Sequence, residues 1–239
     1  MTEFGMIMEP SATYTARLAA RIEAMGFDLL LTPDTQNLVA DPYGQLSLAA
    51  ANTTKLKLGT GVTNPVKRVA AVTAGAVATL QIESGGRAIC GLGRGDSSAA
   101  HIGRRQANTR ELREYALAIQ SYVRGGDVTI GDMVTTMRWI QPDDLPPVPV
   151  DIACTGPRTI RMAADVADRV SFAVGSIPER IDWALDVLNH RLAETGRDRS
   201  EISVGAYINL VCDPDESKAI ELARTITGLV AHFTGMEHA

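Results

Sequence analysis

The stretch that decides the fold is Ser84-Gly85-Gly86-Arg87-Ala88-Ile89-Cys90-Gly91-Leu92-Gly93-Arg94-Gly95-Asp96. Gly85 and Gly86 predict the end of a helix, where a residue with positive φ is needed. Residues 88–92 predict a strand without a polar face, as in parallel sheets that are covered on both sides. Gly93 and Gly95 follow this strand, and only glycine lets another group approach the backbone closely there. Because ligands of α/β folds bind at the carboxyl ends of the strands, this stretch is the first candidate site.

Composition and charge limit the class of protein. The chain has 239 residues, of which 45% are hydrophobic and 21% charged, enough for one large domain. A net charge of −5 argues against a nucleic-acid partner, which would require a basic face. The chain shows no signal peptide and no uninterrupted apolar run of ~18 residues, so no membrane partner is expected.

Cysteine usage indicates the compartment. Cys90, Cys154 and Cys212 each lie within an apolar run. An odd number of such cysteines predicts buried free thiols in a reducing compartment, rather than a disulfide framework or a metal site. We therefore expect a cytoplasmic protein without a bound metal.

Strands and helices alternate along most of the chain. The apolar runs predict strands at residues 4–8, 27–31, 55–62, 88–92, 150–154, 170–174 and 202–212. A hairpin insertion is expected at 127–140, with its turn at Gly131-Asp132. The connections are too short for a second domain, so we expect a single domain over residues 1–239. Units of ~30 residues that alternate strand and helix build either a doubly wound sheet or a (β/α)8 barrel.

Periodicity and capping residues place the helices. The first helix is expected to bury one face made of Tyr14, Leu18, Ile22 and Met25. Another helix is expected over residues 69–82, and the helix after residue 157 is expected to bury Ile160, Ala163, Ala164 and Ala167. Four polar pairs predict helix starts: Asp41-Pro42, Asn108 with Glu111, Ser176 with Glu179, and Asp213 with Glu216.

Three blocks of the sequence resemble the bacterial luciferase-like superfamily. They are residues 58–65 (LGTGVTNP), the stretch 84–96, and residues 155–159 (TGPRT) with the Ala-Asp pair at 167–168. Within the superfamily, the chain resembles the branch that uses the deazaflavin coenzyme F420, typified by methylenetetrahydromethanopterin reductase. The resemblance implies a (β/α)8 TIM-type barrel and a homodimer. Since no eighth strand is predicted before Ala239, the barrel is expected to lack its last βα unit.

The resemblance also assigns the cofactor-binding residues. It implies a cis peptide bond between Gly61 and Val62, in a bulge that backs the coenzyme ring. It places the coenzyme phosphate at the loop before residue 159, where the free amides of a helix N-terminus face an anion. The expected cofactor-binding residues are Gly61, Val62, Thr63, Gly93, Gly95, Asp96, Thr155, Gly156, Pro157 and Arg158. The acidic tail of the coenzyme is expected to meet Lys67, Arg68, Arg94, Arg104 and Arg105.

Two carboxylates are the candidate catalytic residues. Asp34 follows the second strand, beside the position of the reactive carbon of the ring, and Glu9 ends the first strand. Relatives frequently have Asp-His where this chain has Asp34-Thr35, so no histidine acid or base is available there. Asp34 is expected to position a substrate or relay a proton; alternatively, it serves only as a turn or N-cap residue.

The resemblance implies an oxidoreductase that moves a hydride between coenzyme F420 and a small organic substrate. The hydride acceptor is an imine or methylene-pterin-like group, or a carbonyl. An FMN-dependent two-component monooxygenase is the alternative enzyme. A catalytically silent flavin-binding protein is the alternative from another class, because a fold does not fix a function.

Overall fold

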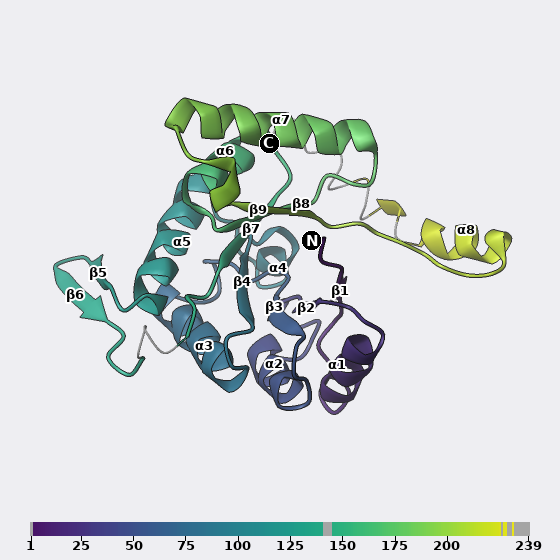
Figure 1. Ribbon diagram of the computed structural model, residues 1–239, viewed down its shortest axis with the longest axis horizontal. Helices are drawn as coiled ribbons and strands as arrows, with labels where there is room; N and C mark the ends of the chain where they lie inside the picture. Colours follow the sequence, from purple (N-terminus) through teal and green to yellow (C-terminus); the bar gives the residue numbers. More distant parts are fainter. Residues whose placement is uncertain (1, 141–144, 226, 229–230, 232–239) are drawn as a thin grey trace. The chain divides into compact units, whose positions relative to one another are not determined.

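The computed structural model describes residues 2–140, 145–225, 227–228 and 231, and the chain forms two compact units. The first unit is Met1–Asp151 and the second is Ile152–Ala239. The model contains the strands and helices of an α/β protein, as expected (Figure 1). The single domain over residues 1–239 stays a prediction.

Four neighbouring parallel strands form the sheet of the first unit. They are β1 (Gly5–Ile7), β2 (Leu29–Thr32), β3 (Lys57–Thr60) and β4 (Ala88–Leu92). The strand β4 has the predicted bounds, and all five of its residues are buried. The amide of Cys90 donates to the carbonyl of Pro149 at 3.0 Å, so the segment that ends just before residue 150 lies beside β4.

Helices surround these strands on the outside (Figure 1). Each packs on the next along the chain: α1 (Thr15–Ala24), α2 (Pro42–Ala51), α3 (Ala70–Glu83) and α5 (Thr109–Val123). A short helix, α4 (Asp96–Ala100), follows β4. The core between helices and strands is aliphatic, with fully buried Leu46, Leu58, Leu80, Ile89 and Ile119.

The predicted caps of α2 and α5 are confirmed. The Asp41 carboxylate accepts a hydrogen bond of 2.9 Å from the amide of Gly44, and Pro42 begins the helix. Asn108 and Glu111 form a reciprocal capping box, in which each side chain accepts from the other residue's amide. Both caps satisfy amides that a helix start leaves without partners.

The predicted buried face of α1 is confirmed only in part. Ile22 is buried as predicted, but Tyr14 and Met25 are exposed, and the helix also buries Thr15 and Ala19. Ala19 and Ile22 have no exposed surface. Small residues allow α1 to approach its neighbour closely, so the apolar period of the larger side chains does not mark the buried side.

Arg87 in the quoted stretch has a structural function that the sequence reading did not assign. Its guanidinium donates to the carbonyls of Ala50, Thr53, Leu56 and Ser84, at distances from 2.6 to 3.1 Å. These include carbonyls at the end of α2, which a helix terminus leaves without partners. Arg87 therefore links the end of α2 to the start of β4.

The glycines at the end of β4 allow close approach, but the atoms that approach them belong to neighbouring residues of the chain and not to a ligand. A Cβ atom on Gly91 would lie 1.9 Å from the carbonyl oxygen of Thr60 in β3. One on Gly93 would lie 2.7 Å from a methyl carbon of Val62. Of Gly93 and Gly95, only Gly95 has a positive φ, of 81°. The glycines thus serve the packing of β3 against β4.

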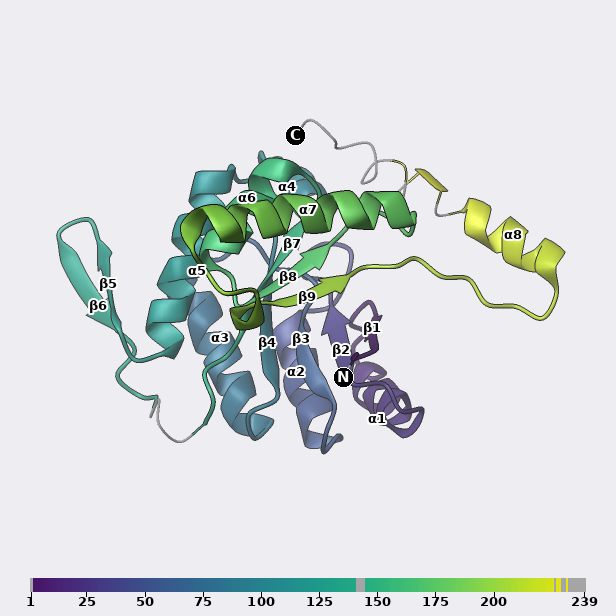
Figure 2. The same ribbon diagram turned by 45° about the horizontal axis from the view of Figure 1, so that its top comes forward.

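The hairpin expected in residues 127–140 is present. It pairs β5 (Asp127–Ile130) with antiparallel β6 (Met133–Thr136), and Gly131 in its turn has a φ of 59°. Figure 2 shows that it extends away from α5. Residues 141–144 lie outside the described part.

The second unit repeats the alternation of strand and helix. β7 (Val150–Cys154) begins at the end of the first unit and leads to α6 (Pro157–Val166), β8 (Arg169–Phe172), α7 (Pro178–Thr195), β9 (Ser203–Ala206) and α8 (Glu216–Arg224). The strands β8 and β9 are parallel. The amide of Ala173 donates to the carbonyl of Cys154 at 2.8 Å, so β8 lies beside β7. The four residues expected to face inward from α6 are all fully buried.

Several expectations for the second unit are wrong. The N-cap position of α7 is Ile177, whose side chain has no hydrogen-bond acceptor, so Ser176 lies one residue too early and forms no capping box with Glu179. Asp215 rather than Asp213 caps α8. The strand expected over 202–212 ends at Ala206, because its partner β8 ends at Phe172. Cys212 is exposed. Cys90 and Cys154 are buried free thiols, as predicted.

Among the described residues, none of the helices has the length and apolar character needed to cross a membrane.

Candidate functional site

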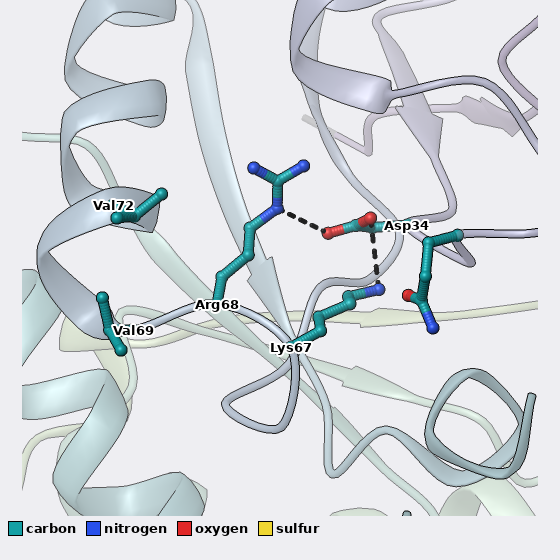
Figure 3. Close-up of a pocket in the computed structure, with 6 residues that line it drawn as sticks. Asp34, Lys67, Arg68, Val69 and Val72 are labelled. Atoms are coloured by element: carbon teal, nitrogen blue, oxygen red, sulfur yellow. Dashed lines mark ion pairs between the residues drawn. The ribbon is translucent and has the colours of Figure 1, made fainter. Parts of the chain in front are cut away.

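A cavity of about 430 Å³ opens at the carboxyl ends of β2 and β3 in the first unit (Figure 3). Three segments supply its lining. The loop after β2 carries two of the residues, the loop after β3 carries two, and the start of α3 adds an apolar wall. The lining residues are Asp34, Gln36, Lys67, Arg68, Val69 and Val72.

Asp34 lies at the centre of the polar contacts in this cavity. Its side chain is 3% exposed, and its carboxylate accepts a hydrogen bond of 2.7 Å from the hydroxyl of Thr63. Lys67 Nζ lies 3.2 Å from Oδ1, and Arg68 Nε lies 3.4 Å from Oδ2. Figure 3 shows the two cations approaching the carboxylate from different sides. A carboxylate this deeply buried requires such partners, because an unpaired buried charge is costly.

Arg68 is held by contacts on several sides. Besides Asp34, it forms an ion pair with Asp41, and its guanidinium lies 4.8 Å from the centre of the Tyr43 ring. Burial lowers the pKa of Arg68, but the two carboxylates raise it more, so the net pKa is raised. Arg68 therefore stays a fixed positive charge beside the cavity.

Lys67 differs from Arg68 in having few partners. Its side chain is 7% exposed, and among the described residues its ion-pair partner is Asp34. That ion pair lacks hydrogen-bond geometry, and Nζ has no hydrogen-bond partner within the described part of the chain. Burial lowers the pKa of Lys67, and Asp34 opposes this shift. The cavity thus contains a buried ammonium with unused donors.

The residues around the predicted cis bond lie next to Asp34. The Gly61–Val62 peptide is cis, as predicted. The amide of Asp34 donates to the carbonyl of Val62 at 3.4 Å, and the hydroxyl of Thr63 donates to the carboxylate. Three of the expected cofactor-binding residues and the leading catalytic candidate are therefore neighbours.

The candidates after β4 belong to the same cluster of loops. The amide of Gly93 donates to the carbonyl of Thr63 at 2.9 Å. A Cβ on Gly95 would lie 2.5 Å from Asn64, which is buried. Asp96, half-buried, is the first residue of α4. Gly93 and Gly95 thus lie beside the loop after β3, and Asp96 follows Gly95 in the sequence.

Glu9 is not part of this arrangement. It follows β1, is exposed, and does not line the cavity. His101, which follows α4, is also exposed. The cluster around Asp34 is therefore the stronger site.

The expected phosphate loop lies in the second unit. Gly156 precedes α6 with an extended backbone, Pro157 is the first helical residue, and the amide of Ile160 donates to the carbonyl of Gly156 at 3.1 Å. Arg158 is exposed in the first helical turn, and Thr155 is half-buried. The first amides of such a helix have no intrahelical partner and favour an anion.

Four of the five basic residues expected to meet the coenzyme tail have side-chain contacts within the protein, and the fifth, Arg104, is exposed. Lys67 and Arg68 pair with Asp34 inside the cavity. Arg94 donates to the carbonyl of Ala107 at 2.7 Å, and Arg105 pairs with Glu111. The sequence alone does not show which basic residues near a strand end form ion pairs with a carboxylate of the protein.

The sequence reading missed Gln36, Val69 and Val72 as lining residues. One amide oxygen of Gln36 is buried without a hydrogen-bond partner among the described residues, and its nitrogen donates to the carbonyl of Ser98 at 2.8 Å. Val69 immediately precedes α3 and Val72 lies in its first turn, and both are exposed on the cavity side (Figure 3). The signal in the sequence that could have identified the two valines is their position soon after the cations Lys67 and Arg68, beyond the end of β3.

Comparisons with known proteins agree with this arrangement. A family model described as luciferase-like monooxygenase matches residues 2–238. A 5,10-methylenetetrahydromethanopterin reductase from Methanolobus tindarius is 34% identical over 233 residues, covering 95% of this chain and 71% of that protein.

Solved structures are similar as well. The coenzyme F420 dependent tetrahydromethanopterin reductase from Methanopyrus kandleri has a TM-score of 0.83 at 29% identity, covering 96% of this chain and 72% of the other. A monooxygenase from Streptomyces bottropensis has a TM-score of 0.77 at 19% identity, over 98% and 79% of the two chains, which shows a shared fold alone. The protein therefore belongs to the luciferase-like monooxygenase family.

Proposed function

We propose that this protein is an oxidoreductase that transfers a hydride between coenzyme F420 and a small organic substrate. The observation that carries the proposal is the cavity at the ends of β2 and β3, which holds the buried Asp34 between two cations. The similarity to reductases, one of them named as F420-dependent, supports this coenzyme over FMN.

The chemistry of the cavity fits a flat ring with polar edges. Its volume lies within the range of about 300–1,000 Å³ that is usual for small-molecule sites. Val69 and Val72 offer an apolar wall. Unused polar atoms of Gln36 and Lys67 offer hydrogen bonds. The bound coenzyme would supply the hydride chemistry.

Each unit by itself carries residues proposed to hold the coenzyme. We propose Gly61, Val62 and Thr63 with Gly93, Gly95 and Asp96 for the ring side, and Thr155, Gly156, Pro157 and Arg158 for the phosphate. Asp34 would orient the substrate, because Thr63 and the two cations fix its carboxylate in one position. Glu9 is the weaker catalytic candidate, since it is exposed.

A fluorescence titration of the purified chain with F420 and, separately, FMN tests the coenzyme. We expect F420 to bind at least ten times more tightly than FMN. The Arg158→Met variant should weaken F420 binding about tenfold, which is about 1.4 kcal/mol, because it removes a charged donor at the phosphate loop. Arg161→Met is the matched control, since Arg161 lies one turn further along α6 and pairs with Glu194 on the surface.

Each other outcome of the titration contradicts the proposal. Tighter binding of FMN would favour a two-component monooxygenase. Binding of F420 without turnover of reducible substrates would favour a silent binding protein. Binding of neither coenzyme would remove the proposed function for this chain.

We also propose that the fold is a barrel of the luciferase-like kind, without the last βα unit. The similarity to the Methanopyrus kandleri structure, at a TM-score of 0.83 over 96% of the chain, supports this arrangement. A cytoplasmic location belongs to the same proposal, because all three cysteines are free.

We propose further that two copies of the chain associate through α2 and α3. These helices contact each other, α2 has no charged residue, and α3 has only Glu83 at its end. Leu48 and Ile82 on their outer faces are each 51% exposed. Depletion of charge over an exposed apolar surface is typical of protein interfaces.

Sedimentation velocity at micromolar concentration tests this association. The unmodified chain should sediment as a dimer, and Leu48→Glu should shift it to a monomer, because a charge would be buried at the interface. Leu222→Glu on α8 is the control, since Leu222 is similarly exposed but lies in the other unit. A monomeric unmodified chain, or a dimeric Leu48→Glu variant, would contradict the proposal.

A further inference from the structure

We propose that the Lys67 ammonium binds the oxygen of a neutral carbonyl substrate and donates a proton to it, so that the substrate pair is a carbonyl compound and its alcohol. This inference rests on the proposed function and selects among its possible hydride acceptors. It assigns to Lys67 a role that the sequence resemblance did not give to any residue of the chain.

The unused donors of Lys67 point to a ligand. The side chain is nine-tenths buried, lines the cavity, and has a single ion-pair partner in Asp34. Its Nζ has no hydrogen-bond partner among the residues that the structure describes. A buried donor without a partner typically costs about 1–3 kcal/mol. An acceptor oxygen of a bound substrate would remove that cost.

The other lining residues cannot supply a proton in this way. The carboxylate of Asp34 accepts from Thr63 and pairs with two cations. Arg68 does not release its proton in proteins, Gln36 is neutral, and two residues of the lining are valines. Burial lowers the pKa of Lys67, so its ammonium donates a proton more readily than an ordinary lysine does.

The proton balances the hydride transfer. When the carbonyl carbon gains a hydride, a C–H bond forms and the π electrons of the C=O bond move to the oxygen. The oxygen takes a proton from Nζ, and the electrons of the broken N–H bond remain on nitrogen as a lone pair. The substrate is reduced by two electrons, the coenzyme is oxidised, and the amine regains its proton from solvent. Oxidation of the alcohol runs through the same steps in reverse.

The charges of the cavity argue against a cationic acceptor. Two positive side chains, Lys67 and Arg68, face one carboxylate, Asp34. A methylene group between two nitrogens accepts a hydride only after one C–N bond breaks: the electrons of that bond go to the leaving nitrogen, which takes up a proton, and the carbon becomes part of an iminium cation. Such a cation would be repelled beside a buried ammonium, where the effective dielectric constant is low.

Two probes of similar size distinguish these substrate classes. Cyclohexanone represents the neutral carbonyl and 1-methyl-1-pyrrolinium represents the iminium, and ligand-observed NMR measures their binding to the full chain with and without F420. We expect the unmodified chain to bind cyclohexanone at least ten times more tightly. Lys67→Met should lose that preference, whereas Lys55→Met, at an exposed lysine, should keep it.

A charge-conserving variant separates proton donation from packing. Lys67→Arg keeps the positive charge beside Asp34 but cannot release a proton. It should retain the preference for cyclohexanone while kcat for its reduction falls about 100-fold or more. In the unmodified enzyme kcat should fall as pH rises through the lowered pKa of Lys67, and this fall should be absent in Lys67→Arg.

The outcomes that overturn the inference are distinct from failure of the proposed function. If F420 binds but the unmodified chain prefers the pyrrolinium probe, or binds neither probe, the inference is wrong and the proposed function stands. The same holds if Lys67→Arg retains full kcat and the pH dependence. If F420 itself does not bind, the proposed function fails.

Discussion

Replacing Asp34 with asparagine should lower kcat/KM for F420-dependent turnover at least about 100-fold, the loss that a misplacement of a bound substrate by about 1 Å can cause. Asparagine keeps the shape of the side chain but removes its charge. Lys67 and Arg68, which lie 3.2 and 3.4 Å from the carboxylate oxygens, would lose their shared counter-ion. Lys67 would then be free to move, whereas Arg68 would keep its pair with Asp41, and the substrate would lose its fixed partner.

The same substitution should reduce stability. Removing one partner of a buried ion pair typically costs about 3–5 kcal/mol, because the remaining charge stays buried without compensation. Urea denaturation measures this loss, and steady-state kinetics together with F420 titration measure the functional effect. Asp41→Asn is the matched control, since Asp41 also pairs with Arg68 but is exposed. An Asp34→Asn enzyme with kcat/KM within threefold of the unmodified enzyme would exclude the proposed role.

The sequence predicts the position of Asp34 but not its partners. A polar residue soon after a buried strand must lie beyond the carboxyl end of that strand. The position of Asp34 therefore follows from the pattern of β2 alone. Lys67 and Arg68 are separated from Asp34 by more than 30 residues in the sequence. Their pairing depends on the parallel register of β2 and β3, which aligns Thr32 with Thr60 and so brings the following loops together.

Local signals predict the fold best where a single interaction decides the outcome. The bounds of β4 and β7 follow from short apolar runs that end at glycine or a polar turn, and the capping box of α5 follows from two side chains that satisfy each other. The expected strand over 202–212 is too long because strand length depends on the neighbour: β8 pairs with four residues of β9 only. Likewise, α1 buries small residues because of the helix beside it, which no periodicity within α1 reveals.

Gly91→Ala should be the most destabilising of the single-methyl substitutions in β4. Its Cβ would lie 1.9 Å from the carbonyl oxygen of Thr60, far inside van der Waals contact, and this oxygen belongs to the backbone of β3. Because a backbone atom cannot rotate away, β3 and β4 would have to separate. We expect a loss of about 3 kcal/mol or more in the free energy of unfolding, at or above the upper end for overpacked cores.

This separation should also reach the candidate site. The carbonyl of Gly91 accepts hydrogen bonds from the hydroxyl of Thr60 at 2.7 Å and from the amide of Thr63 at 2.9 Å. Thr63 in turn donates to Asp34, so a shift of β4 would displace the carboxylate. Gly75→Ala in α3 is the matched control: no atom lies within 4 Å of its added methyl group, and alanine favours a helix by up to about 1 kcal/mol. Urea denaturation compares the free energies of unfolding of the two variants. If Gly91→Ala lies within 1 kcal/mol of Gly75→Ala, the close packing of β3 on β4 does not determine the stability of this sheet. The glycines of residues 84–96 would then serve the approach of a ligand instead.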